Sequence, residues 1–260
     1  MTTSSRSMTT TTPWGGPRDS WADRTRHPVW LAAGLVAATT IASLVVAGVM
    51  AALAPGSATD IRRLVAVLVV AALAVAVVVV TGGWHRTATR GPAGWRHLGL
   101  LAVPLLVALA PAVLGFDLPA TGTLAVLVAG YAATGVYEEV WHRGVVLDVL
   151  RQQGLRRSAV IGGAFFGAAH LTNVAFGQAV AVSAAQAFGA FCFGIGFSVL
   201  RWRTGAVWVL AAIHALGDLM LKITGLHGGL MWAFLVGHDT LMLLWGLWCL
   251  RGADNDVVDA

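Results

Sequence analysis

The sequence predicts an all-α protein, a polytopic membrane helical bundle with about eight transmembrane helices. Apolar residues make up 57% of the 260-residue chain and charged residues only 11%, which is far from the balance of a soluble globular domain. Uncharged apolar runs long enough to cross a bilayer recur along most of the chain. The arginines between these runs form no basic patch, so the formal charge of +5 does not indicate nucleic-acid binding.

Three regions follow from this distribution of apolar residues. Residues 1–28 are rich in Ser, Thr, Pro and Gly, and we expect them to form a disordered cytoplasmic tail without a cleavable signal peptide. Residues 29–251 hold the transmembrane bundle, and residues 252–260 form a short acidic C-terminal tail. The expected helices cover residues 29–54, 64–82, 98–115, 122–150, 157–176, 178–200, 205–224 and 229–250.

The apolar runs differ in what they contain. The first two are nearly featureless in Ala, Val and Leu, which is typical of lipid-facing scaffold helices. Pro104 and Pro111 should kink the third. The fourth is long for one crossing, so part of 143–150 should emerge at the interface. Cys192 and Cys249 lie within apolar runs without metal-ligand spacing, and we interpret them as small core residues.

The basic residues predict the orientation of the chain. If the spans alternate, Arg62, Arg63 and Lys222 fall on one side of the membrane, and Arg143 lies inside it. By the positive-inside rule, the Arg-rich side and both termini are cytoplasmic, and the bundle lies in the plasma membrane. The basic residues of that side are Arg6, Arg18, Arg24, Arg26, Arg86, Arg90, Arg96, Arg151, Arg156, Arg157, Arg201, Arg203 and Arg251.

Three charged residues at the end of an apolar run need a reason. Glu138, Glu139 and Arg143 close the run that begins at Leu124, and one charge at bilayer depth costs roughly 3 kcal/mol. At helical spacing Glu139 and Arg143 share a face, whereas Glu138 and Glu139 point in different directions. We therefore expect Arg143 to pair with Glu139 and Glu138 to face a hydrated cavity. An ion pair that only fixes helix packing is the alternative.

Two other spans carry a histidine at a similar depth. Glu138 lies 13 residues before Arg151, His170 lies 13 residues after Arg157, and His214 lies 11 residues after Arg203. These spacings place all three side chains roughly 16–20 Å from the basic side, at about 1.5 Å per residue. A lone buried histidine is usually a core residue, but three ionisable side chains at one level indicate a common site.

Such a cluster suits two kinds of hydrolytic chemistry. A carboxylate and a histidine can hold and deprotonate a water, and a second histidine can stabilise the oxyanion that forms at a carbonyl. Glu138, His170 and His214 could instead ligate a divalent metal such as zinc, with a water as the fourth ligand. The His-Glu-x-x-His motif of many metalloproteases is absent from the sequence.

These residues resemble the three signatures of the CAAX protease and bacteriocin-processing (CPBP or Abi) family of intramembrane endopeptidases. The resemblance covers a motif-bearing core at about residues 122–222 and also fits the eight-helix plan. Each motif alone is weak, but all three in order form a specific signal. The matching residues are Glu138-Glu139-x-x-x-Arg143, Phe166-x-x-x-His170 and His214-x-x-x-Asp218.

The resemblance implies roles for these residues. Glu138 would activate the water with help from His170, while His214 and Asp218 would line the oxyanion site. The supporting residues would be Glu139, Arg143 and Phe166. The family is often described as metalloproteases, and a metal-free glutamate mechanism is also proposed for it, so the resemblance leaves a metal cofactor open.

The third motif departs from the family pattern at Asp218, where the family often has Asn. An ionised Asp accepts hydrogen bonds and cannot donate one to an oxyanion. We therefore expect Asp218 to orient His214; a metal ligand, a protonated donor and an ion-pair partner of Lys222 are the alternatives. Four further residues have candidate side chains: we interpret His142 and Asp148 as structural, while His238 and Asp239 of the last span could plug or line the cavity without belonging to a motif.

The leading functional hypothesis is an intramembrane endopeptidase that cleaves a membrane-associated peptide or protein, in CAAX-type or leader-peptide processing. Its partners would be that substrate and the lipid bilayer. A non-proteolytic membrane scaffold or immunity protein with the same fold is the second hypothesis. A proton or metal transporter is the third, because buried Glu and His can relay ions.

Overall fold

The computed structural model describes residues 25–91 and 97–253, and the regular elements in this part of the chain are helices. They form eight continuous helical segments at the eight predicted positions, which confirms the all-α fold. The predicted tails at residues 1–24 and 254–260, and Arg96, lie outside the described residues. The elements are α1 (Pro28–Leu53), α2 (Thr59–Thr81), η1 (Leu98–Leu101), α3 (Ala102–Leu109), η2 (Ala110–Leu114), α4 (Thr121–Glu138), η3 (Glu139–Val146), α5 (Leu147–Leu150), η4 (Arg151–Gln153), α6 (Leu155–His170), η5 (Leu171–Phe176), α7 (Val180–Thr204), α8 (Val207–Ile223) and α9 (Gly228–Ala253).

Five of the described helical segments are long and apolar enough to cross a membrane, namely α1, α2, α6 with η5, α7 and α9. The apolar segment Leu98–Leu114 is shorter. Large apolar side chains such as Leu53, Val80 and Val113 point outward, as expected for helices surrounded by lipid. The protein is therefore a multi-pass membrane protein.

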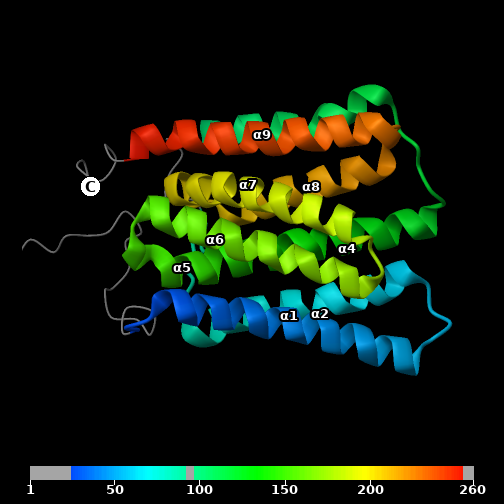
Figure 1. Ribbon diagram of the computed structural model, residues 1–260, viewed down its shortest axis with the longest axis horizontal. Coiled ribbons are helices and arrows are strands. Elements are labelled where there is room, and N and C mark those ends of the chain that lie inside the picture. The colour runs from blue at the N-terminus through cyan, green and yellow to red at the C-terminus, as the bar shows by residue number, and fades with distance from the viewer. Residues whose placement is uncertain (1–24, 92–96, 254–260) are drawn as a thin grey trace, which may run out of the picture.

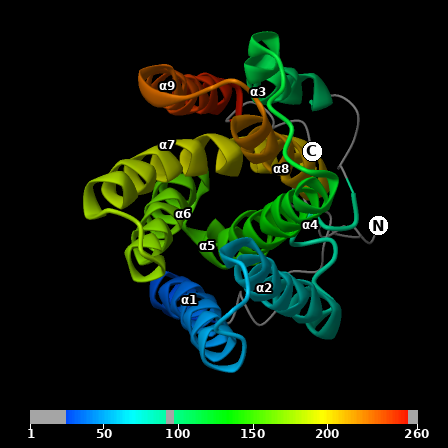
Figure 2. The same ribbon diagram turned by 90° about the vertical axis from the view of Figure 1, so that its right-hand side faces the viewer.

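The helices with the polar motifs lie in the middle of the bundle. The long helices run roughly side by side (Figure 1). Seen from the end, α1 and α2 lie at one edge and α3 and α9 at the opposite edge (Figure 2). Helix α4 packs against α2 and α8, and α7 packs against α6 and α9. The segment η3, which continues α4, contacts both α6 and α8, so the three motif-bearing parts of the chain meet there although they are far apart in the sequence.

Glycine allows α6 and α7 to approach closely. A Cβ atom on Gly167 would lie 2.5 Å from the carbonyl oxygen of Ala187 and 3.1 Å from the Cβ of Phe191. Helix pairs in membranes commonly depend on such small residues, because they let the two backbones come into contact. Gly162, on the same helix, has only ordinary contacts at its Cβ position, the nearest at 3.8 Å. Gly167 therefore helps to set the spacing of α6 and α7, together with Gly163, whose Cβ position would lie 3.0 Å from the carbonyl oxygen of Phe191.

Two segments depart from a regular α-helix, and a departure was expected from the prolines in the second of them. The motif segment η3 is a π-helix rather than a continuation of α4. A π-helical turn holds one more residue than an α-helical turn and recurs at functional sites. In the third segment, α3 is flanked by the 3₁₀ turns η1 and η2, and Pro111 lies at the start of η2. Proline has no N–H to donate, which explains why the α-helical pattern stops there.

Several arginines assigned to one side of the membrane also have a structural role. Arg86 donates two hydrogen bonds to Asp148, at 3.2 Å from Nε and 3.0 Å from Nη2, and Arg151 pairs with the other oxygen of that carboxylate at 3.4 Å. The buried guanidinium of Arg201 donates to the backbone carbonyl of Arg86. These contacts tie the loop after α2 to the end of α5 and to α7, and they show that Asp148 has the predicted structural role.

Candidate active site

The first motif lies at the junction of two helix types. Glu138 is the last residue of α4, and the π-helix η3 begins at Glu139. The side chains of Glu139 and Arg143 are 0% and 1% exposed. Their contact joins Nε of Arg143 and Oε2 of Glu139 at 3.3 Å, so the predicted ion pair forms. Two opposite charges at this depth reduce the cost that either would have alone.

Arg143 is enclosed by aromatic rings as well as by its carboxylate. Its guanidinium carbon lies 4.1 Å from the centre of the Phe166 ring. The rings of Phe193 and Phe197 are 5.6 and 5.9 Å away. Cation–π contacts of this kind are strongest where water is excluded. Phe166 therefore supports the site as expected, whereas nothing in the sequence distinguished Phe193 and Phe197 from ordinary core residues.

Glu139 also holds His214 of α8. The Nδ1 atom of His214 lies 2.8 Å from Oε1 of Glu139. An ionised carboxylate can only accept, so Nδ1 carries the hydrogen of this bond. The bond fixes the orientation of the ring and directs Nε2 toward the other carboxylates. The carboxylate that accepts the orienting hydrogen bond from His214 is thus that of Glu139, whereas the sequence had suggested Asp218 for this role.

Two further carboxylates lie beside Nε2 of His214. Oε2 of Glu138 is 3.5 Å away, and Oδ2 of Asp218 is 3.8 Å away. The Glu138 side chain is 16% exposed and Asp218 is 32% exposed. Glu138 and Glu139 therefore contact opposite nitrogens of one imidazole, in keeping with the expectation that they point in different directions.

The second motif adds an imidazole from α6. Nδ1 of His170 lies 2.9 Å from the carbonyl oxygen of Phe166. A carbonyl only accepts, so Nδ1 donates and Nε2 keeps its lone pair in the neutral ring. The edge of His170 packs on the Phe166 ring, with 4.8 Å between centroids. His170 also lies within electrostatic range of the Glu138 carboxyl group.

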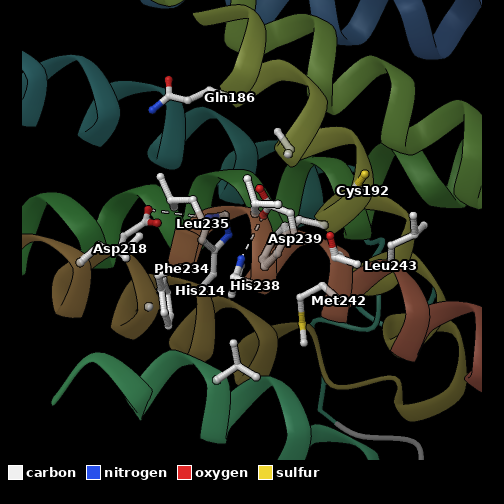
Figure 3. A pocket seen from close by; sticks show the side chains of 18 of the residues that line it. Gln186, Cys192, His214, Asp218, Phe234, Leu235, His238, Asp239, Met242 and Leu243 are labelled. Atoms are coloured by element: carbon white, nitrogen blue, oxygen red, sulfur yellow. Dashed lines mark hydrogen bonds and ion pairs between the residues drawn. The ribbon is translucent and has the colours of Figure 1, made fainter. Parts of the chain in front are cut away.

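A cavity of about 410 Å³ lies beside these groups (Figure 3). Its lining includes His170, His214 and Asp218 from the motifs, and His238 and Asp239 from α9. Glu138 does not belong to this lining, although its side chain is 16% exposed. Its carboxyl group packs against His214, whose ring forms part of the cavity wall, so Glu138 lies next to the cavity.

His142, another candidate from the sequence, does not line this cavity. His142 is buried, 5.0 Å from the Phe166 ring and 6.3 Å from the Tyr137 ring between centroids, in keeping with a structural role.

The described residues contain no group of three or more His, Cys, Asp or Glu side chains placed to hold a metal ion. A metal site made by Glu138, His170 and His214 stays a prediction from the sequence.

Comparisons with known proteins give one finding and two negative results. Residues 119–220 match the family model described as Rce1-like, type II CAAX prenyl endopeptidase Rce1-like. Neither the curated proteins nor the solved structures contain a significant match. The matched segment begins just before α4, ends within α8 and contains the three motifs in order. This segment of the chain is therefore similar to the Rce1-like CAAX endopeptidases, a family of proteases, in agreement with the resemblance that the motifs indicate.

Proposed function

We propose that the protein is an intramembrane endopeptidase in which Glu138 activates a water for attack on a peptide bond. The observation that supports this most strongly is the set of contacts around His214. One imidazole contacts Glu138 and Asp218 through Nε2 and is held through Nδ1 by Glu139, which is itself paired with Arg143. If the Glu139–Arg143 pair were purely structural, it would not need further carboxylates beside His214, of which Asp218 is 32% exposed.

The reaction can be written with these side chains alone. Glu138 takes a proton from water as the water oxygen bonds to the carbonyl carbon of the substrate, and a tetrahedral oxyanion forms. His170 would assist by accepting a hydrogen bond from the water through Nε2. His214, in its imidazolium form, would offer its Nε2 hydrogen to the oxyanion. The carbon–nitrogen bond then breaks, and the leaving amine takes the proton from Glu138.

The substrate would be a membrane-associated peptide or protein, processed as in CAAX-type or leader-peptide cleavage. We assign the Arg-rich end of the bundle to the cytoplasmic side of the plasma membrane. The positions of Arg86, Arg151 and Arg201 support this assignment, because these three arginines lie at the same end of the helices. Reporter fusions to the two chain ends would contradict it if either reporter were active outside the cell.

Purified full-length protein in nanodiscs, offered internally quenched apolar peptides, tests the proposal. Glu138→Gln keeps the shape of the side chain but removes the base, so turnover should fall by about a thousandfold. Asp117→Asn is the matched control, because Asp117 is 77% exposed in a loop away from the site. Equal cleavage by wild type and Glu138→Gln would end the assignment of Glu138. A chelator should leave the wild-type rate unchanged, and rescue of chelated protein by added zinc would show a metal mechanism instead.

A further inference from the structure

Helix α9 places a His–Asp pair on the wall of the cavity, outside the segment that matches the protease family. Nδ1 of His238 lies 3.0 Å from Oδ1 of Asp239. The two side chains are 21% and 24% exposed. Since an ionised carboxylate accepts, His238 donates this bond, and its Nε2 is left for other contacts. The proposed reaction uses neither residue.

The pair is held in place by aromatic rings and by a glycine. The His238 ring stacks on Phe193 and on Phe234, at 5.7 and 6.1 Å between centroids. The same Phe193 ring lies 4.9 Å from the ring of His214, so a single aromatic side chain contacts both imidazoles. The carboxylate of Asp239 lies directly over Gly189, where a Cβ atom would overlap it. Gly189 therefore provides the space that the carboxylate fills.

The imidazolium proposed for His214 on this cavity wall already contacts the carboxylates of Glu138 and Glu139, so the remaining carboxylates set the charge of the cavity. Its described lining contains the carboxylates of Asp218 and Asp239 but no Lys or Arg. The nearby guanidinium of Arg143 is 1% exposed and already paired with Glu139, so it cannot reach a substrate. The rest of the lining is mostly apolar, and charges interact more strongly beside apolar walls than in bulk water. A cationic group is attracted into such a cavity, and a carboxylate is repelled.

We propose that the His238–Asp239 pair, together with Asp218, selects peptides that carry a Lys or Arg side chain in the segment occupying the cavity. This inference rests on the proposed function, because it names the substrate class of the same site. The Asp239 carboxylate would bind the cationic side chain of the peptide, and His238 would hold that carboxylate in position. The Phe193 ring, which contacts both imidazoles, would keep His238 next to His214. A free C-terminal carboxylate would be disfavoured in this part of the cavity.

Peptide binding tests the selection separately from cleavage. The probes are apolar fluorescent peptides that are identical except for Lys, Gln or Glu at one central position. Binding is measured by fluorescence polarisation to full-length protein in nanodiscs, in the Glu138→Gln background so that no peptide is consumed. The Lys peptide should bind at least about tenfold more tightly than the Glu peptide, because an opposite charge is replaced by a like charge beside Asp239.

Two variants locate the effect. Asp239→Asn should remove most of the preference for the Lys peptide over the Glu peptide. Gly189→Ala keeps every charge but displaces the carboxylate, so it should reduce the preference similarly. Asp117→Asn, which removes an exposed carboxylate in a loop, should leave the preference intact.

The outcomes separate the two proposals. Equal affinity for the Lys and Glu peptides, tighter binding of the Glu peptide, no binding of any peptide, or a preference that survives Asp239→Asn would each overturn the selection. A preference for Lys in binding, with equal cleavage by wild type and Glu138→Gln, would instead leave the selection standing and remove the assignment of the base.

Discussion

The spacing of α6 and α7 gives a prediction whose size can be worked out from the structure. In Gly167→Ala, the new Cβ atom would lie 2.5 Å from the carbonyl oxygen of Ala187, where ordinary contact begins at 3.4 Å. The difference, 3.4 − 2.5, is 0.9 Å. A backbone carbonyl cannot swing away as a flexible side chain could. The two helices must therefore separate by about this amount, or both backbones must deform.

The expected cost combines two opposing effects. Overpacking a tight contact destabilises by about 1–3 kcal/mol, and replacing Gly by Ala within a helix contributes up to about 1 kcal/mol in the other direction. Gly162→Ala is the matched control: it makes the same substitution at a buried position of α6, and its nearest contacts are at 3.8 Å. The control should be neutral or slightly stabilised. Gly167→Ala should be about 1–3 kcal/mol less stable than the control.

The same shift should affect catalysis, because His170 lies on the next turn of α6. A misplacement of about 1 Å can lower a rate by about a hundredfold. Thermal unfolding in nanodiscs and turnover of a quenched peptide would be measured for wild type, Gly162→Ala and Gly167→Ala. If Gly167→Ala unfolds at the same temperature as Gly162→Ala and turns over equally fast, the helix spacing does not position the site, and the reasoning is wrong.

Three further predictions concern single charges. Arg143→Met should lower the free energy of unfolding by about 3–5 kcal/mol, because it leaves the buried Glu139 carboxylate without a counter-charge. Thermal unfolding measures this loss, and the double variant Arg143→Met/Glu139→Gln should recover part of it. Asp148→Asn should also destabilise by several kcal/mol, whereas Asp117→Asn, in an exposed pair, should change stability by less than about 1 kcal/mol in the same assay. Asp218→Asn should keep or improve turnover of uncharged peptides, because Glu139 orients His214; complete loss of turnover would point to a role that requires the carboxylate, such as metal binding.

Apolar run length predicted most of the fold. Each long run became a helical segment within a few residues of its expected bounds, because a chain in lipid must satisfy its backbone hydrogen bonds internally. The pairing of Glu139 with Arg143 was also predictable, since both residues belong to one local segment and few arrangements can neutralise two buried charges. The side-chain contacts that a sequence reveals best are those within one helix.

Contacts between helices were harder to predict. His214 is 75 residues from Glu139, and only the packing of α4 on α8 decides which carboxylate holds its Nδ1. The sequence spacing of His214 and Asp218 suggested the local partner instead. His238 and Asp239 could be named as candidates, but their place on the cavity wall depends on the close approach of α7 and α9 at Gly189.

The arginines illustrate a different limit. Counting charges by side explained why they gather at one end of the helices, but it could not show which of them are buried. Arg201 is 2% exposed and Arg86 is 9% exposed, and both help to tie a loop to the bundle. Topology and local structure therefore both constrain these positions, and a count of loop charges captures only the first.

The wide turn at Glu139–Val146 has a consequence for how such a chain could change over time. A π-helical segment arises when one amino acid is inserted into an α-helix. Deletion of a single codon within this segment would restore an α-helix and rotate α4, with Glu138, by about 100° relative to the residues that follow the deletion. One small indel could thus disrupt the proposed site while the apolar spans, and hence membrane insertion, stayed intact.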